Sequence, residues 1–141
     1  MFTTWLYISV SALPADAQAV AVNSIVDVSR HRNADLGVTG ALIFSGSRFA
    51  QLVEGPADSV AIIRAAIERD VRHRTVTTIE AGTVDGRLFE GWSLAYSGHS
   101  TFVDRELRRI GEQYVQDGAG ASRNLKMVLT EFSRSGGINE L

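Results

Sequence analysis

Apolar and polar residues alternate along five short stretches of the chain, and two longer stretches between them carry apolar residues at helical spacing. The alternating stretches predict strands at residues 3–11, 38–44, 48–54, 75–84 and 88–96. Residues 17–32 predict a first helix, and a second helix follows, capped by Asp58 and ending near Asp70. The predicted order is therefore β-α-β-β-α-β-β. This order is typical of an α+β, ferredoxin-like sheet with two helices on one face.

The C-terminal part of the chain has a different character. Residues 102–115 are charged and amphipathic, and residues 123–132 form another short helical segment after a break at 117–120. We expect these two helices to cover the sheet face that the first two leave bare, because an isolated sheet with an apolar second face needs a cover. The expected organisation is a main unit, residues 1–97, with a helical extension of the same domain, residues 98–141, ending in a short Ser/Gly-rich tail.

The composition fits one ordinary globular domain. The chain has 141 residues, of which 45% are hydrophobic and 21% charged, with a formal net charge of -2. It has no cysteine, which excludes disulfides, thiolate metal sites and cysteine nucleophiles. His31, His73 and His99 lie in no ligand-spaced motif, so no metal site is predicted. Without a basic leader, a long apolar run or a strong net charge, we expect a cytoplasmic protein that binds neither nucleic acid nor membrane.

One predicted strand carries an amide at the centre of its apolar face. In residues 48–54 the two-residue period places Phe49, Gln51 and Val53 on the same side. A buried amide without partners costs roughly 1–3 kcal/mol, so Gln51 needs a hydrogen bond. The first and third strands of this topology are normally neighbours at the sheet centre, which makes Tyr7 the candidate partner. We predict a hydroxyl–amide pair that faces the helices.

Two further polar groups are expected beside this pair. One is a stripe on the first helix that turns polar towards its C-terminal end. Its members are Ile25, Ser29, Arg32 and Asn33. The other is the loop after the second helix, where basic residues could meet an anion. Its members are Asp70, Arg72 and His73. Together they predict a polar-lined slot between the two helices, floored by Tyr7 and Gln51, that suits a flat heterocycle.

Each of these residues also has an ordinary structural interpretation. A strand glutamine is usually exposed or locally satisfied. Asn33 fits a helix C-cap, and the cluster at residues 69–74 fits a solvated loop. Phe89 and Trp92 fit core positions. Only the combination favours a binding site.

Five sequence blocks resemble the successive motifs of the BLUF family, small domains that sense blue light using a flavin. The blocks span about residues 5–97 and read LYIS, SRHRN followed by LGVTGALIF, RFAQLVEG, I-x-x-D-x-R-H from Ile67 to His73, and RLFEGWSL. The resemblance implies a ferredoxin-like photosensory domain that holds FAD non-covalently between its two helices, with FMN or riboflavin as alternatives. It implies no enzymatic turnover.

The resemblance also implies roles for individual residues. Tyr7 matches the photoactive tyrosine, which gives an electron and a proton to the excited flavin. Gln51 matches the glutamine whose hydrogen bonds then rearrange, and Trp92 matches a semi-mobile tryptophan. Asn33 matches the asparagine that binds the pyrimidine edge of the flavin. The expected cofactor-binding residues are Tyr7, Ile25, Ser29, Arg32, Asn33, Phe49, Gln51, Val53, Ile67, Asp70, Arg72 and His73.

The chain departs from the family pattern at Leu94, where the motif W-S-M has methionine; the change removes a flexible thioether. We expect the C-terminal helices to relay the signal to a partner protein, and we expect a homo-oligomer, a dimer or larger. Two alternatives remain. One is a flavin-free ferredoxin-like regulatory module that binds protein. The other is acylphosphatase, an enzyme of similar topology, although the SVSALPAD connection lacks its glycine-rich phosphate loop.

Overall fold

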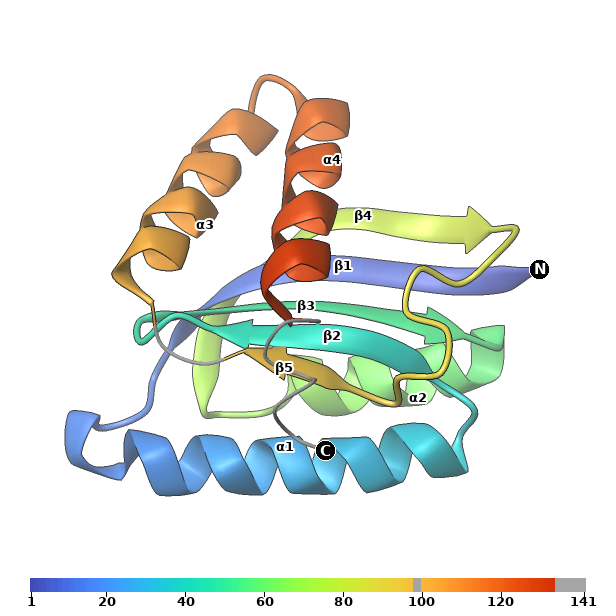
Figure 1. Cartoon of the computed structure of the whole chain (residues 1–141), viewed down its shortest axis with the longest axis horizontal. Helices are drawn as coiled ribbons and strands as arrows, with labels where there is room; N and C mark the ends of the chain where they lie inside the picture. Colours follow the sequence, from blue (N-terminus) through green and yellow to red (C-terminus); the bar gives the residue numbers. More distant parts are fainter. Residues whose placement is uncertain (98–99, 134–141) are drawn as a thin grey trace.

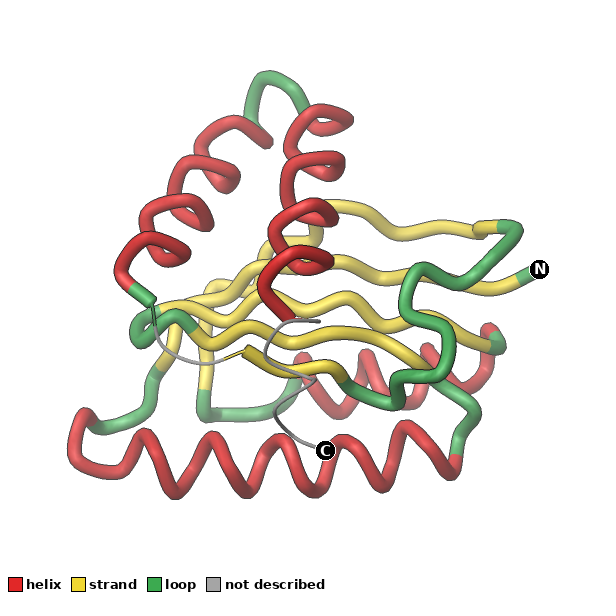
Figure 2. Tube along the Cα trace, in the orientation of Figure 1, coloured by secondary structure: helices red, strands yellow, loops and turns green. Residues whose placement is uncertain are grey.

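The computed structural model describes residues 1–97 and 100–133, which form a five-stranded sheet with helices on both faces (Figures 1 and 2). The sheet order is β4-β1-β3-β2-β5, with β5 parallel to β2 and the other neighbours antiparallel. The strands are β1 Phe2–Ser11, β2 Thr39–Phe44, β3 Arg48–Gly55, β4 His73–Val84 and β5 Ala95–Ser97. The helical elements are η1 Ala15–Ala17, α1 Gln18–Asp35, α2 Ala57–Glu68, α3 Thr101–Tyr114, α4 Gly118–Val128 and η2 Leu129–Ser133.

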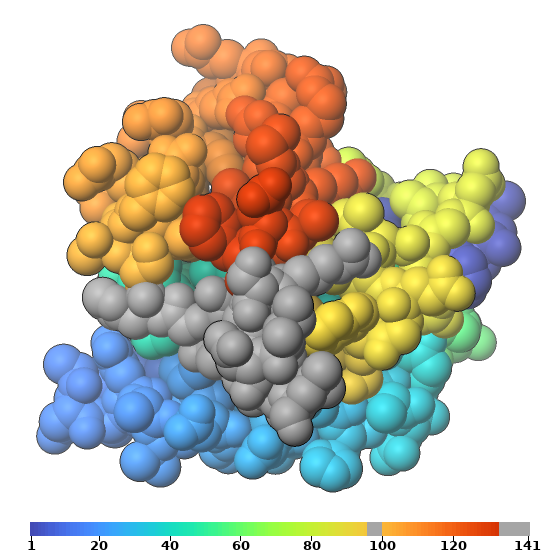
Figure 3. Space-filling model, viewed as in Figure 1, coloured from blue at the N-terminus to red at the C-terminus, as the bar shows by residue number. Residues whose placement is uncertain are grey.

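The two faces of the sheet carry separate apolar cores, because alternate residues of a strand point to opposite sides. In β1, Leu6 and Ile8 belong to the core under α3 and α4, whereas Trp5 and Tyr7 belong to the core under α2. Helix α1 lies on one side of the sheet and the α3–α4 pair on the other (Figure 1), and the space-filling view shows them at opposite ends of the molecule (Figure 3). The predicted α+β fold, with C-terminal helices on the second face, is confirmed.

The last strand was predicted too long. Only Ala95–Ser97 is a strand, and residues 85–94 form a connection with turns. Gly91 has φ 87°, a left-handed conformation that a continuous strand does not contain. In addition, the backbone N–H groups of Leu88 and Phe89 donate to the carboxylate of Glu54, which draws this segment away from sheet pairing.

Two helix starts also differ from the sequence prediction. Pro56 occupies the N-cap position of α2, without a side-chain cap bond, and Asp58 lies within the first turn. The predicted break at 117–120 is the beginning of α4, because the Asp117 carboxylate accepts a hydrogen bond from Gly120 N at 2.9 Å and caps this helix. The proposed division after residue 97 stays a prediction. Residues 98–99 and the tail at 134–141 lie outside the described residues.

The described residues contain no helix long and apolar enough to cross a membrane. Within the same residues, no group of His, Asp and Glu side chains could hold a metal ion.

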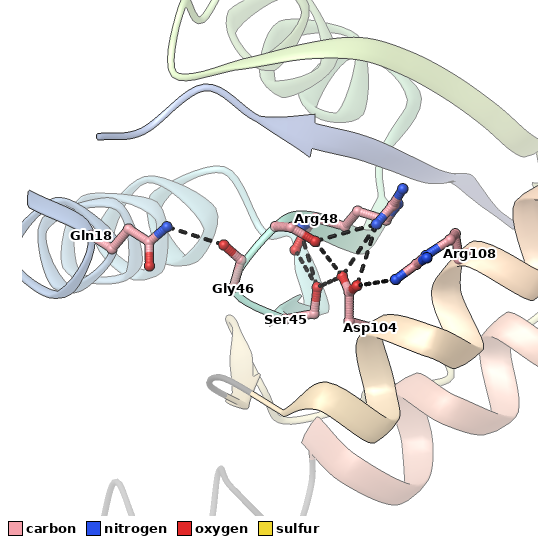
Figure 4. Close-up of polar contacts among 7 residues, drawn as sticks. Gln18, Ser45, Gly46, Arg48, Asp104 and Arg108 are labelled. Carbon is pink, nitrogen blue, oxygen red and sulfur yellow. Dashed lines mark hydrogen bonds and ion pairs between the residues drawn. The ribbon is translucent and has the colours of Figure 1, made fainter. Parts of the chain in front are cut away.

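Asp104, in the first turn of α3, clamps this helix to the turn between β2 and β3 (Figure 4). Its Oδ1 accepts hydrogen bonds from Ser45 Oγ at 2.5 Å and from Ser47 Oγ at 2.6 Å. Arg48 and Arg108 add ion pairs at 3.4 and 3.2 Å. Burial by itself raises the pKa of Asp104, but the serine hydrogen bonds and the arginine contacts outweigh it and lower the pKa to about 2.

We expect Asp104→Asn to destabilise the protein in a pH-dependent way. A carboxyl group with a lowered folded-state pKa contributes stability above its unfolded pKa of about 4, and this contribution is lost as the pH falls towards about 2. The difference in free energy of unfolding between wild type and variant should be roughly 2 kcal/mol at pH 6 and shrink below pH of about 4. Urea titrations at several pH values measure it.

Asp85→Asn is the matched control, because Asp85 lies exposed in the turn after β4. We expect this variant to follow the wild type at every pH. A difference for Asp104→Asn that stays constant from pH 6 to pH 3 would show that the ionised carboxylate does not hold the clamp.

Candidate functional site

Tyr7 and Gln51 lie side by side on the two central strands. The β1–β3 register pairs them directly, and Tyr7 Oη donates a hydrogen bond to Gln51 Oε1 at 2.6 Å. Both side chains are buried on the side of the sheet that faces α1 and α2, as the alternation of β3 predicts. Burial, followed by the charge of Asp70, raises the pKa of the Tyr7 hydroxyl, so the phenol keeps its proton at neutral pH. The structure thus contains the predicted hydroxyl–amide pair.

The Tyr7 ring is held by the neighbouring Trp5. Trp5 stacks on it with ring centroids 4.5 Å apart and an interplanar angle of 29°. Trp5 is fixed in turn, because its Nε1 donates to Thr78 Oγ1 at 2.9 Å and the Arg64 guanidinium lies 4.8 Å from its ring centroid. The phenol therefore has little freedom to turn away from Gln51.

A cleft opens over this pair, between α1, the end of α2 and the loop that follows α2. All but two of the predicted cofactor-binding residues line it: Tyr7, Ile25, Ser29, Arg32, Phe49, Gln51, Ile67, Asp70, Arg72 and His73. The sequence prediction missed Val28, Leu42 and Ala66, which also line the cleft. Val28 follows Ile25 at the i,i+3 spacing that places two side chains on one helix face, and this spacing could have identified it.

Val53 and Asn33 are the two predicted residues that do not line the cleft. Val53 is fully buried in the apolar core with Trp5 and Ile63, so its ordinary interpretation as a core residue suffices. Asn33 lies within α1 rather than at its C-cap, which is Leu36. It is fully buried, and its Nδ2 donates to the Ser93 carbonyl at 2.8 Å.

Two buried polar atoms at the end of α1 have no hydrogen-bond partner among the described residues. They are Arg32 Nε and Asn33 Oδ1. Buried polar atoms in native proteins are normally paired, and one left unpaired costs about 1–3 kcal/mol. Burial also lowers the pKa of the Arg32 guanidinium. Arg32 lines the cleft, so its Nε is a donor free for a ligand there, whereas Asn33 Oδ1 is buried outside the cleft lining.

Arg72, one of the two basic residues expected after α2, forms an ion pair within the protein. The Arg72 side chain binds the Asp70 carboxylate from Nη2 at 2.6 Å and from Nε at 2.9 Å, and the Arg72 backbone N–H also donates to it at 2.9 Å. The hydrogen bonds from Arg72 lower the pKa of Asp70, and the same contact raises the pKa of Arg72. Both are charged at neutral pH and form an ion pair at the cleft mouth, and the expectation that the basic pair Arg72 and His73 meets an external anion stays a prediction.

Trp92 and Leu94 lie on opposite faces of the sheet. Trp92 is partly buried and packs against the core under α3 and α4, away from the cleft. Leu94 is buried on the cleft side, in a cluster with Leu42 and Phe49, which line the cleft. The residue that replaces the family methionine is therefore the one next to the cleft, and the role predicted for Trp92 stays a prediction.

Comparisons with known proteins agree with one another. A family model described as BLUF, sensors of blue-light using FAD, matches residues 2–95. The blue light- and temperature-regulated antirepressor BluF of Escherichia coli (strain K12) is 35% identical over 89 residues, 63% of this chain and 22% of that protein. Photoactivated adenylate cyclase subunit beta of Euglena longa is 31% identical over 93 residues, 65% of this chain and 11% of that protein. The chain thus spans less than a quarter of these two relatives.

Solved structures show the same likeness. The BLUF protein BlrB in its dark state is 25% identical with a TM-score of 0.72, over 95% of this chain and 96% of BlrB. BlsA in its photo-activated state is 23% identical with a TM-score of 0.75, over 94% of this chain and 95% of BlsA, which supports the fold alone. Klebsiella pneumoniae BlrP1 with FMN and cyclic diGMP is 26% identical with a TM-score of 0.63, over 84% of this chain and 35% of BlrP1.

Proposed function

This chain belongs to the BLUF family of blue-light sensors, which use a flavin and are not themselves enzymes, and we propose that it detects blue light through FAD bound in the cleft over Tyr7 and Gln51. The observation that carries the proposal is the 2.6 Å hydrogen bond from Tyr7 Oη to Gln51 Oε1 on the cleft floor. Family membership leaves the acylphosphatase alternative without support.

The residues of the cleft fit a flavin. A flavin ring system is flat and largely apolar, with hydrogen-bond donors and acceptors along one edge. The walls supplied by Ile25, Val28 and Ile67 suit its apolar faces. Arg32 Nε, a donor of the cleft lining without a partner among the described residues, suits its polar edge, and the predicted flavin contact of Asn33 stays a prediction. We propose FAD as the bound form; the FMN of BlrP1 belongs to that protein.

The flavin, when bound and excited by blue light, supplies a strong oxidant. Tyr7 is the residue we propose as the donor. Its phenol is protonated and buried, so loss of an electron alone would leave a cation in an apolar site, and loss of a proton alone would leave a buried phenolate. The hydrogen bond would let the phenol proton pass to Gln51 Oε1 as the electron passes to the flavin, and both would return to Tyr7 when the charges recombine. Joint loss of electron and proton is therefore the least costly step.

Gln51 is the proposed switch. Its amide has a donor end and an acceptor end, and Tyr7 now holds the acceptor end. Once the Tyr7 proton has moved, the Tyr7 hydroxyl no longer donates to Gln51 Oε1, and the amide can adopt the orientation in which its donor and acceptor ends are exchanged. Two hydrogen-bond patterns of similar energy make a local switch that a small chemical event can reverse.

We propose that the light signal leaves the protein through the α3–α4 pair. This pair packs on the sheet face opposite the cleft, and Asp104 clamps it to the β2–β3 turn. The strands β2 and β3 carry Leu42, Phe49 and Gln51 of the cleft, so a change at Gln51 has a short route to α3. We propose that a partner protein receives the signal there. A homo-oligomer stays a prediction.

The test of this function is the absorption spectrum of the purified protein. We expect a yellow protein whose flavin bands move to longer wavelength under blue light and return in darkness. Chromatography of the pigment released by denaturation distinguishes FAD from FMN and riboflavin. A colourless protein that also fails to take up added FAD would contradict the proposal and favour the flavin-free protein-binding module.

A further inference from the structure

His73, the first residue of β4, is held at both of its ring nitrogens by the protein itself. Its Nδ1 lies 2.7 Å from Ser9 Oγ on β1, and its Nε2 lies 2.7 Å from the carbonyl oxygen of Ile67 in the last turn of α2. Ser9 is 1% exposed and follows Tyr7 by two residues, on the same face of β1. The imidazole thus bridges three elements that surround the cleft.

The two partners determine where the ring carries its hydrogen. A carbonyl oxygen only accepts, so Nε2 must carry the N–H that donates to Ile67. In the neutral ring Nδ1 then has a lone pair and accepts, and the Ser9 hydroxyl is its donor. With both nitrogens engaged in this way, His73 has no N–H left for a ligand, and its contribution to the cleft lining is the edge of its ring.

The fixed ring supports two aromatic residues of the cleft. His73 lies edge-on to Tyr7, with centroids 6.0 Å apart at 69°, and edge-on to Phe49, with centroids 6.1 Å apart at 90°. Tyr7 is therefore confined between Trp5, which stacks on it, and His73, which meets it edge-on. Release of the imidazole would remove one of these two restraints on the phenol.

We propose that Ser9 is a positioning residue for the light response. Its hydroxyl, by donating to Nδ1, holds the His73 ring in one orientation and one tautomer, and the ring in turn keeps the Tyr7 hydroxyl directed at Gln51. The effect on the light response rests on the proposed function, whereas the Ser9–His73 hydrogen bond is a property of the protein alone.

Nitrogen NMR of the imidazole in wild-type protein tests the hydrogen bond first. At a pH at which the ring is neutral, we expect a single tautomer protonated at Nε2, with an Nδ1 resonance displaced towards that of a hydrogen-bonded nitrogen. In Ser9→Ala the Nδ1 resonance should move to the position of a free lone pair, and Ser9→Thr, which keeps the hydroxyl, should restore it. A wild-type ring protonated at Nδ1, or an Nδ1 resonance unchanged in Ser9→Ala, would overturn the assignment.

The light response of the same variants, loaded with FAD, tests the positioning role. We expect the fraction of molecules shifted per absorbed photon to fall at least about threefold in Ser9→Ala, from the loss of one hydrogen bond, and to recover in Ser9→Thr. Ser11→Ala is the control, since Ser11 Oγ accepts from Leu13 N on the same strand. A full response in Ser9→Ala, with Nδ1 released, would overturn the role. A wild type without any response would instead contradict the proposed function.

Discussion

Tyr7→Phe is expected to bind flavin and to lose the light-induced red shift completely. The substitution removes only the hydroxyl that donates to Gln51 Oε1 at 2.6 Å. The phenyl ring can still stack on Trp5 and meet His73 edge-on, so the floor of the cleft keeps its shape. Without the hydroxyl, no proton can accompany the electron. The event that changes the hydrogen bonds of Gln51 therefore does not occur. Absorption spectra before and after blue light measure the loss.

Tyr114→Phe provides the control for this experiment. Tyr114 is partly buried against the core at the end of α3, on the sheet face opposite the cleft. This variant should keep both the flavin and the full reversible shift. A complete photocycle in Tyr7→Phe would remove Tyr7 from the mechanism, and the Gln51 switch would then need another trigger.

The features that sequence reasoning predicted correctly depend on short-range periodicity. Alternation along β1 and β3, together with the usual neighbourhood of these two strands, was enough to place Tyr7 opposite Gln51. Helical spacing was enough to bring Ile25, Ser29 and Arg32 to one cleft wall. Local pattern determines which way a side chain faces, and the topology then determines which faces meet.

The features that the sequence did not predict depend on contacts between distant residues. The serine–carboxylate clamp joins Ser45 to Asp104, 59 positions away, and neither residue has a local pattern that reveals it. Asn33 was predicted at the cleft, but its Nδ2 instead donates to Ser93 O, 60 positions away, because the 85–94 connection passes beside α1. The β-rich composition of residues 88–96 favoured a strand, and the contacts to the Glu54 carboxylate outweighed that preference.

Glu54→Ala is expected to have the largest effect on stability, about 3 kcal/mol or more. Glu54 is 2% exposed at the end of β3. Its carboxylate accepts from Leu88 N and Phe89 N, each at 2.7 Å, and from Thr39 Oγ1 at 2.9 Å. The loss of the acceptor costs about 1–3 kcal/mol for the buried N–H of Phe89 and less for the two partly buried donors, and the deleted side chain leaves a cavity as well. The free energy of unfolding from urea titration measures the loss.

Amide hydrogen exchange identifies the residues that lose protection in Glu54→Ala. The amides of Leu88 and Phe89 should exchange much faster in Glu54→Ala, because the carboxylate that accepts from them is gone. Asn33 should respond as well, since its partner Ser93 belongs to the same 85–94 connection. Glu68→Ala, at the half-exposed end of α2, is the control and should change stability by no more than about 0.5 kcal/mol. Equal stability of the two variants would mean that the Glu54 carboxylate does not hold this connection against the sheet.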